Sequence, residues 1–505
     1  MGGGTSTNGG YFDNRQNARV ETEDLDCSHM SRFKNSPKRV AASTIAVSSV
    51  ANPHAPLFAP APFRQVHPKT FQPLSENDVG SPNIVASVGF FLYCAYVLSG
   101  FANDWALRLF GNKAYISTIA LVLLPVAWLL SGNALRGLQR PAGRWWVAFL
   151  VWLLLAVPFS VWKGGSAAML WNYVPRNYLT FFYICAFATS LRRCRTLMYV
   201  NAAGAVILLL TCLKFGAAGS AEGGRFVIPE SLFYGNANDL GLALLLAVTS
   251  FLFLVYQTGM KKRILGLVGI LLSVMYALKT GSRGCMLAGV ALFVLIFLFS
   301  KKKLATAVFA LPVIGLSLLL LPSATVHRLL LFGINSSELQ AESVSDVAAI
   351  GSQIEREELF KKSLYYTVTH PLLGVGPNQF AVAMAGDAAK QGNHSPWLGT
   401  HNSYTQVSSE CGIPALICYC AVLMLSFRSN WRLCRRSLDN PLLKDVASLS
   451  FCLLASILVY AVSTFFFHIA YSGGLPALAG LSLAFQLVAE PLLASRTADQ
   501  PVVMA

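Results

Sequence analysis

Two arginines and one histidine lie near the ends of uncharged apolar segments, where they could act on a phosphate-linked substrate. Arg225 lies in EGGRFVIPE, Arg283 in KTGSRGCM and His401 in GTHNSYTQ. A guanidinium binds phosphate oxygens through a flat, two-pronged set of donors and keeps its charge at physiological pH. A neutral imidazole can take a proton from a hydroxyl group. Together these residues suggest transfer from a lipid-linked phosphate donor to a hydroxyl.

Each of these residues also has an ordinary explanation. Arg283 could extend its side chain to lipid phosphates, and Arg225 could be a solvated loop residue. His401 could cap the helix that follows it, or it could be a core histidine. Arg176, in NYVPRNYL, is a further candidate phosphate ligand, although it could equally be an exposed residue next to a helix start. Only their shared location, at what we expect to be the outer face of a membrane, favours the chemical explanation over the ordinary ones.

The composition places these residues in a membrane protein. Hydrophobic residues make up 54% of the chain and charged residues only 12%, whereas a soluble chain has about a quarter charged residues. The net charge of +16 does not indicate nucleic-acid binding, because the basic residues form short clusters between apolar runs. The 11 cysteines lie mostly inside apolar runs without a CxxC pair. We therefore expect no disulfide framework, no metal site and no cofactor.

Uncharged apolar segments recur along the chain, most of them close to the ~20 residues that cross a bilayer. They cover 84–101, 114–132, 145–162, 178–191, 197–213, 239–256, 264–278, 285–300, 304–322, 411–427, 446–467 and 474–490. The expected fold is all-α, with about 12 transmembrane helices and a large external loop between helices nine and ten. Helices one to nine would occupy 81–322, the external loop 323–403, and the last three helices 404–492.

The two ends of the chain differ from this pattern. Residues 1–80 offer little apolar surface to bury, so they are expected to form a disordered tail, and no apolar core follows a basic start as in a signal peptide. Residues 493–505 are expected to be a short C-terminal tail.

The basic residues between the segments predict the orientation. Every second loop is basic, which places those loops and both termini in the cytoplasm. The basic loops contain Arg136, Arg140 and Arg144; Arg192, Arg193 and Arg195; Lys261, Lys262 and Arg263; Lys301, Lys302 and Lys303; and Arg428, Arg432, Arg435, Arg436 and Lys444. The four candidate site residues and the loop at 323–403 would then lie outside.

The external loop contains a predicted amphipathic helix at 352–370, which should lie on the membrane surface or cover a cavity. Ser352 and Glu355 could form its capping box, and Pro371 ends it. Its predicted apolar stripe consists of Ile354, Leu359 or Phe360, Leu364 and Val368. A turn with Gly374 and Gly376 follows in HPLLGVGPNQF. Elsewhere, GNANDLGLA at 235–243 predicts a helix start, with Asn238 or Asp239 as N-cap.

Four stretches resemble the O-antigen ligase and O-antigen polymerase superfamily of bacterial envelope glycosyltransferases. HNSYTQVSSECGIPA contains the family's His-Asn pair, nine further residues and Gly412. HPLLGVGPNQF, TGSRG and GRFVIPESLFYGNANDLGLA resemble three other segments of the family. The sequence departs from the pattern at Ala237, where the family usually has Pro, and at Ala415, where it has Gly.

The resemblance implies metal-independent, inverting transfer of a glycan from undecaprenyl pyrophosphate to a hydroxyl, outside the inner membrane. The implied site residues are Arg225, Arg283 and Arg176 for the pyrophosphate, His401 as the base, and Asn402 and Tyr404 in support. The acceptor would be lipid A core, as in O-antigen ligation, a growing polysaccharide, as in a polymerase, or a protein hydroxyl.

A different class, an anion or solute transporter, is the main alternative. Transporters usually place polar residues or broken helices near the middle of the membrane. Here the candidate charges lie at one face, which favours an enzyme.

Overall fold

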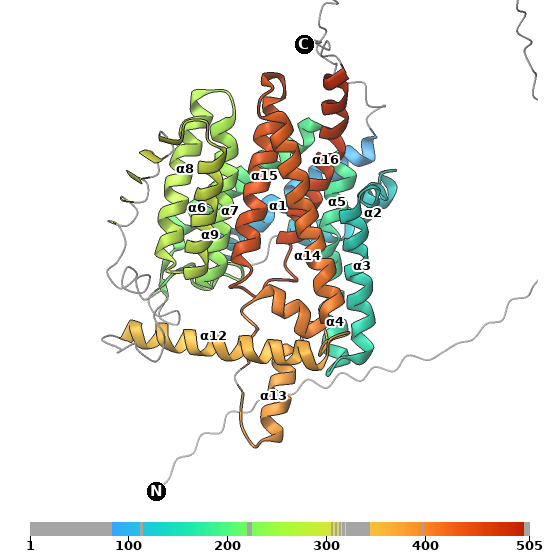
Figure 1. Ribbon diagram of the computed structural model, residues 1–505, viewed down its shortest axis with the longest axis vertical. Coiled ribbons are helices and arrows are strands. Elements are labelled where there is room, and N and C mark those ends of the chain that lie inside the picture. The colour runs from blue at the N-terminus through green and yellow to red at the C-terminus, as the bar shows by residue number, and fades with distance from the viewer. Residues whose placement is uncertain are drawn as a thin grey trace, which may run out of the picture. The chain divides into compact units, whose positions relative to one another are not determined.

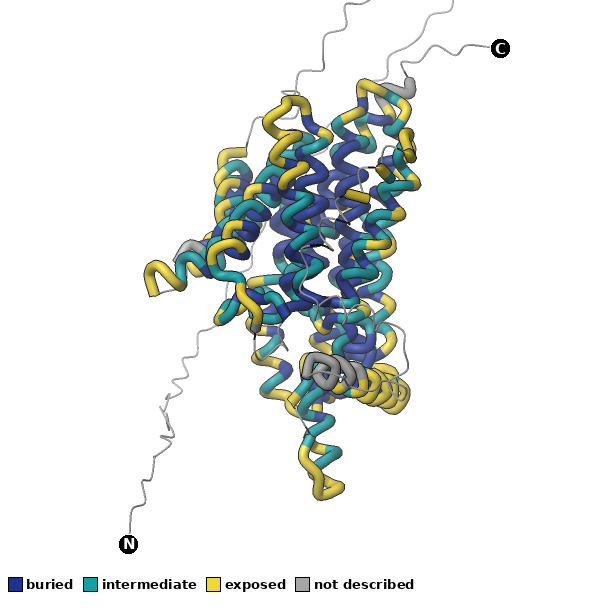
Figure 2. The backbone as a smooth tube through the Cα atoms, turned by 90° about the vertical axis from the view of Figure 1, so that its left-hand side faces the viewer, coloured by how far each residue is buried: buried dark blue, intermediate teal, exposed yellow. Residues whose placement is uncertain are grey.

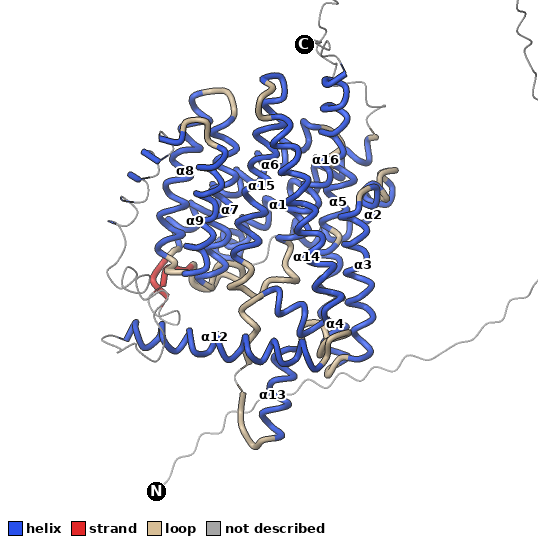
Figure 3. The backbone as a smooth tube through the Cα atoms, viewed as in Figure 1, coloured by secondary structure: helices blue, strands red, loops and turns tan. Residues whose placement is uncertain are grey.

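The chain forms a helical bundle in the computed structural model (Figures 1 and 3). The structure describes residues 83–111, 115–219, 225–304, 344–395 and 397–498 and some of 307–319. Seven helical segments of this part are long and apolar enough to cross a membrane: Ile84–Phe110, Pro141–Phe159, Leu191–Phe215, Ala237–Tyr256, Ser403–Ser437, Pro441–Ser463 and Gly474–Ala494. Two shorter apolar helices are Ser117–Leu130 and Arg283–Phe299. The predicted all-α, multi-pass class agrees with these helices, whereas the predicted count of 12 is not confirmed.

The elements follow in chain order. The helices are α1 (Ile84–Phe110), α2 (Tyr115–Leu130), α3 (Pro141–Ala156), α4 (Lys163–Tyr173), α5 (Thr180–Phe187), α6 (Leu191–Phe215), α7 (Ala237–Tyr256), α8 (Met260–Lys279), α9 (Arg283–Phe299), α12 (Val344–Thr369), α13 (Phe380–Lys390), α14 (Ser403–Ser437), α15 (Lys444–Ser463) and α16 (Gly474–Ala498). Two short antiparallel strands, β1 (Ala217–Gly219) and β2 (Arg225–Val227), pair with Gly219 opposite Arg225.

The predicted segment 178–191 differs most from the structure. It folds as α5, and eight helical residues rise only about 12 Å, which is too short to cross a bilayer alone. Val174–Tyr178, just before it, forms a turn of π-helix that contains Arg176. All eight residues of α5 are buried, so the apolar run reflects burial inside the protein rather than contact with lipid. The predicted tail at 1–80 and most of the predicted segment 304–322 lie outside the described residues.

The centre of the bundle consists of α7 and α15, and Figure 2 shows the buried residues along the inner helices. In these two helices 72% and 78% of the most apolar window is buried. Both sequences are apolar around the whole helix, as expected for helices that contact other helices on every side. The first turn of α7 and the last turn of α15 therefore have fixed positions at one end of the bundle.

The helix of the external loop, α12, is longer than predicted and packs through another face. It begins at Val344 and continues through Gly351, so Ser352 lies inside the helix and is not its N-cap. It ends at Thr369, before Pro371, as predicted. Figure 1 shows it running across the end of the bundle, next to α13.

Among the side chains of α12 that the structure describes, Leu359, Ser363 and Tyr366 are buried. Most of the predicted apolar stripe is instead exposed, with Ile354 at 44%, Leu364 at 42% and Val368 at 76%. Leu359 and Tyr366 pack with Val375 and Phe380 in a small separate core. The segment that follows α12 therefore decides which face of this helix is buried. The periodicity of the α12 sequence alone does not reveal that this segment packs against it.

Candidate functional site

Arg225 is held at the end of the bundle by two helix termini. Its Nε donates to the carbonyl oxygen of Thr280, at the end of α8, at 2.8 Å. Its Nη2 donates to Asn238 Oδ1, in the first turn of α7, at 2.7 Å. The residue is only 7% exposed. The structure thus rules out the interpretation of Arg225 as an ordinary solvated loop residue.

Asn238 also connects Arg225 to the Ser-Arg-Gly segment. Ser282 Oγ donates to the same Asn238 Oδ1 at 2.8 Å. Ser282 is the N-cap of α9, whose first residue is Arg283. Two of the predicted pyrophosphate ligands, Arg225 and Arg283, therefore belong to one cluster of three helix ends.

The N-cap of α7 corrects a prediction. Asn236, rather than Asn238 or Asp239, caps this helix, because Asn236 Oδ1 accepts from the backbone N–H of Asn238 at 2.8 Å. The amide of Asn238 is consequently available as the shared acceptor for Arg225 and Ser282. The amino-terminal ends of α7 and α9 both lie in this cluster, and each adds a partial positive charge that favours an anion.

His401 lies opposite a second histidine that sequence reasoning missed. The rings of His401 and His468 meet edge to face, with centroids 4.9 Å apart. His468 comes from the loop between α15 and α16, where no motif marked it. His401 itself has φ +50°, a backbone conformation that is uncommon outside glycine.

A positive charge from the external loop also acts on His401. Burial, followed by the charges of His468 and of Arg356 in α12, lowers the pKa of His401 to about 4. The imidazole is therefore neutral at physiological pH and can accept a proton. Sequence reasoning missed Arg356, because it lies among alternating charges on an amphipathic helix, a pattern typical of a solvated face.

Asn402 and Tyr404 position the backbone at the start of α14. Their polar groups bond to this region and to α15 rather than to His401. Asn402 Oδ1 caps α14 by accepting from the backbone N–H groups of Tyr404 and Thr405 at 2.9 and 3.1 Å. Tyr404 Oη donates to the carbonyl oxygen of Ala461 at 2.8 Å, and its ring packs on Phe465. Both residues support His401 indirectly, by fixing the start of α14 against the end of α15.

The loop between α15 and α16, residues 465–473, joins the arginine cluster to His401. Its Phe466 packs against Gly284 in the first turn of α9, where an added Cβ would lie 2.6 Å from Phe466 Cβ. Its Phe467 and Ile469 bond to Ser403, since Ser403 Oγ donates to the Phe467 carbonyl at 2.6 Å and accepts from Ile469 N–H at 3.0 Å. His468 lies between these anchors. One short loop therefore contacts both the Ser-Arg-Gly segment and the histidine segment.

The glycines of the external turn and of α14 allow two backbones to touch. Gly374, Gly376 and Gly412 all have positive φ, and a Cβ on any of them would lie 2.0–2.2 Å from an atom of a neighbouring segment. Backbone bonds run from Val375 N–H to the Ser409 carbonyl and from Ile413 N–H to the Pro371 carbonyl. The spacing from the His-Asn pair to Gly412 is thus explained by docking of the external loop on α14.

Arg176 is not brought into either cluster. It is exposed in the π-helical turn before α5, and its carbonyl oxygen accepts from Tyr96 Oη at 3.0 Å. In the described part of the chain, its guanidinium makes no contact with Arg225, Arg283 or His401. Its ordinary explanation, an exposed residue near a helix start, is therefore the better supported one.

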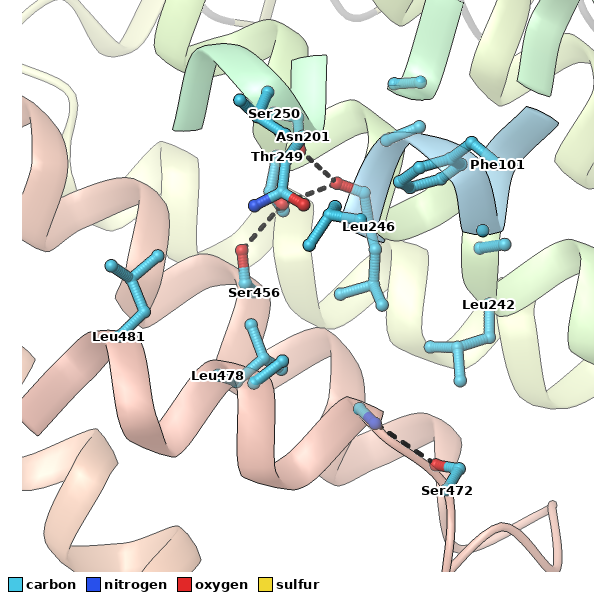
Figure 4. A pocket seen from close by; sticks show the side chains of 18 of the residues that line it. Phe101, Asn201, Leu242, Leu246, Thr249, Ser250, Ser456, Ser472, Leu478 and Leu481 are labelled. Atoms are coloured by element: carbon cyan, nitrogen blue, oxygen red, sulfur yellow. Dashed lines mark hydrogen bonds between the residues drawn. The ribbon is translucent and has the colours of Figure 1, made fainter. Parts of the chain in front are cut away.

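A cavity of about 570 Å³ begins beside the arginine cluster. Asp239 and Tyr234 line it near the start of α7, and α1, α6, α7, α15 and α16 form its walls. Figure 4 shows leucines on both sides, among them Leu242, Leu246 and Leu478. Further along, Thr249 and Ser456 bond to each other at 2.7 Å across it. The mostly apolar walls suit a chain-like, apolar group rather than a charged one.

Comparison with protein families agrees with the motifs. Residues 268–420 match the family described as O-Antigen ligase, which confirms the resemblance seen in the sequence. The match includes Arg283, the external turn, His401 and Gly412, whereas Arg176, Arg225 and His468 lie outside it. No curated protein matched the chain.

Proposed function

We propose that this protein transfers a glycan from undecaprenyl pyrophosphate to an acceptor hydroxyl at the outer face of the bacterial inner membrane, since residues 268–420 match the family described as O-Antigen ligase. The observation that carries the proposal is the loop 465–473. It packs on Gly284, next to Arg283, and holds His468 against His401. An anion-binding cluster and a neutral base thus share one structural element.

The donor pyrophosphate would lie at the cluster formed by Arg225, Arg283 and the starts of α7 and α9. Guanidinium groups and helix amino-termini both stabilise phosphate oxygens. Arg356 adds a further positive charge on the His401 side. The cavity beside Asp239 offers room for part of the apolar polyprenyl chain. The proposal does not require Arg176.

In the proposed reaction, His401 takes the proton of the acceptor hydroxyl as its oxygen attacks the anomeric carbon. The bond between that carbon and the pyrophosphate oxygen breaks, and the electron pair leaves with the pyrophosphate. Attack from the face opposite the leaving group inverts the anomeric centre. The arginines stabilise the charge that develops on the leaving group, and His401 then releases its proton to solvent. The protein groups named here supply these steps without a metal ion.

Reconstitution of the full chain tests this proposal. We expect the purified protein in proteoliposomes to move a glycan from an undecaprenyl-pyrophosphate donor to lipid A core in the presence of EDTA, with the Arg283→Ala variant inactive. Donor consumption requiring added Mg²⁺, or full activity of Arg283→Ala, would contradict the mechanism. Movement of donor or anions across the membrane without any new glycosidic bond would instead support a transporter.

The acceptor is tested separately, in a strain lacking the protein. Loss of polymer from lipid A, together with polymer accumulating on the carrier lipid, identifies the ligase activity that we propose. Lipid A capped by single repeat units instead identifies a polymerase.

A further inference from the structure

A second pocket lies at the other end of α14 from His401, at the face that the basic loops predict to be cytoplasmic. It has a volume of about 260 Å³ and is formed by the start of α3, the second half of α14 and residues 483–490 of α16. Its charged lining residues are Arg140, Arg428, Arg432 and Glu490. Neither the glycan donor nor the acceptor of the proposed reaction would reach this end of the bundle.

The lining changes from apolar to charged along two parallel stripes. On α14, Leu425, Arg428 and Arg432 follow one another at helical spacing, and on α16 Leu483, Gln486 and Glu490 do the same. Leu425 and Leu483 lie toward the middle of the bundle, and the charged residues lie toward its end. This gradient has the same polarity as a membrane lipid, whose chains lie deeper than its head group.

The positive charges in the pocket exceed the negative ones. Glu490 is the single acidic lining residue, and both of its carboxylate oxygens are occupied. One accepts from Arg140 Nη2, and the other accepts from Gln486 Nε2 at 2.7 Å. The guanidinium groups of Arg428 and Arg432 have no hydrogen bond or ion pair within the part of the chain that the structure describes. Two guanidinium charges in the pocket are therefore left to bind something else.

The polar groups of the lining favour an anion that only accepts hydrogen bonds. The hydroxyls of Ser426 and Ser429 already donate to carbonyl oxygens of their own helix, at 2.8 and 2.9 Å. Arg140 is the N-cap of α3 and makes no side-chain capping bond, so the amino-terminal end of this helix adds partial positive charge to the wall. The free donors of the lining are thus guanidinium groups, which bind phosphate oxygens through two-pronged contacts.

We infer that this pocket binds a phosphate-bearing head group, that of an anionic membrane phospholipid, between α3, α14 and α16. Basic pockets between transmembrane helices on the cytoplasmic side commonly bind such head groups. The two leucines would contact the upper part of the lipid chains. Because the lipid would connect three helices, its binding should stabilise the folded protein.

The test measures binding and thermal unfolding of the full chain in detergent micelles doped with phosphatidylglycerol or with phosphatidylcholine. We expect phosphatidylglycerol, but not phosphatidylcholine, to raise the melting temperature of the wild type. The R428Q/R432Q variant should bind phosphatidylglycerol at least about tenfold more weakly, since each guanidinium contributes a charge-assisted contact. The control R192Q/R436Q loses the same charge from two exposed arginines outside the pocket and should behave as wild type.

Two further measurements keep the outcomes distinct. R428K/R432K retains the charge without the two-pronged donors and should bind phosphatidylglycerol with intermediate affinity. This variant also tests the inference if R428Q/R432Q does not fold. Inorganic phosphate alone should raise the melting temperature little, and a shift equal to that of phosphatidylglycerol would identify a soluble phosphate ligand instead. Equal phosphatidylglycerol binding by R428Q/R432Q and R192Q/R436Q would overturn the inference.

Discussion

Phe466 lies so close to Gly284 that any side chain at residue 284 would overlap its ring, with an added Cβ only 2.6 Å from Phe466 Cβ. This contact fixes the distance between the start of α9, with Arg283, and the loop that holds His468 against His401. The glycine of the Ser-Arg-Gly segment therefore has a packing role that couples the two halves of the candidate site.

Gly284→Ala is expected to displace loop 465–473 and to reduce glycan transfer by about tenfold or more, because overpacking typically costs about 1–3 kcal/mol. Gly289→Ala in the same helix is the matched control, since its Cβ would have only Leu245 at 3.8 Å as a neighbour. Transfer assays on equal amounts of purified protein give the comparison. Restored activity in Gly284→Ala/Phe466→Gly, which removes the Cβ and the ring that an alanine at 284 would overlap, would support the steric cause. An unaffected Gly284→Ala variant would refute the coupling.

Arg283→Lys is expected to lose activity by roughly tenfold or more, because an ammonium cannot reproduce the two-pronged contact with pyrophosphate, worth about 1.5–3 kcal/mol. Arg176→Lys should transfer glycan at a nearly normal rate, since the structure places Arg176 outside the cluster. Donor binding and initial rates measured side by side separate the two. The reverse ranking of the variants would move the donor site toward α5.

His401→Ala is expected to insert normally and bind donor, but to transfer glycan at least ~100-fold more slowly, as is typical for loss of a general base. The exposed His394 of the external loop supplies the control, and His394→Ala should retain activity. Membrane abundance is measured with turnover. Low abundance with normal turnover per molecule would mean that His401 is only a structural residue.

Arg356→Gln is expected to move the acid limb of the kcat/KM profile to higher pH. A nearby cation disfavours the imidazolium, so Arg356 contributes to the lowered pKa of His401, and its removal raises that pKa. Activity requires neutral His401 and is therefore lost as pH falls through this pKa, from a higher starting point in the variant. An unchanged acid limb, measured between pH 4 and 8, would show that another group controls it.

Glu410→Ala is expected to loosen the external loop. Its carboxylate is 3% exposed and accepts from the backbone N–H groups of Asn378 at 2.9 Å and Phe380 at 3.4 Å, at the start of α13. Loss of both contacts should cost about 1.5–3 kcal/mol and speed proteolysis of the loop. Glu358→Ala, which removes an exposed carboxylate of the same loop, is the control. Equal proteolysis of both variants would argue against this anchoring role.

The sequence by itself determined the class of protein and the main chemical groups. Long uncharged segments predict membrane helices because backbone polar groups must be satisfied inside a helix in lipid. Arg283, His401 and the glycines of the external turn lie in short motifs, in which neighbouring residues fix the local backbone. The end of α12 before Pro371 follows from the same local rules.

Only the tertiary structure decided which residues meet. Asn238 becomes the shared acceptor of Arg225 and Ser282 because Asn236 takes the capping role. It also requires that the first turns of α7 and α9 lie next to the last turn of α8. His468 and Arg356 join His401 from segments 67 and 45 residues away, and nothing in their local sequence specifies that proximity. The apolar segment 178–191 resembles a membrane span, yet it is a short buried helix, because protein and lipid are equally apolar neighbours. Such contacts depend on packing between distant segments, which local sequence does not encode.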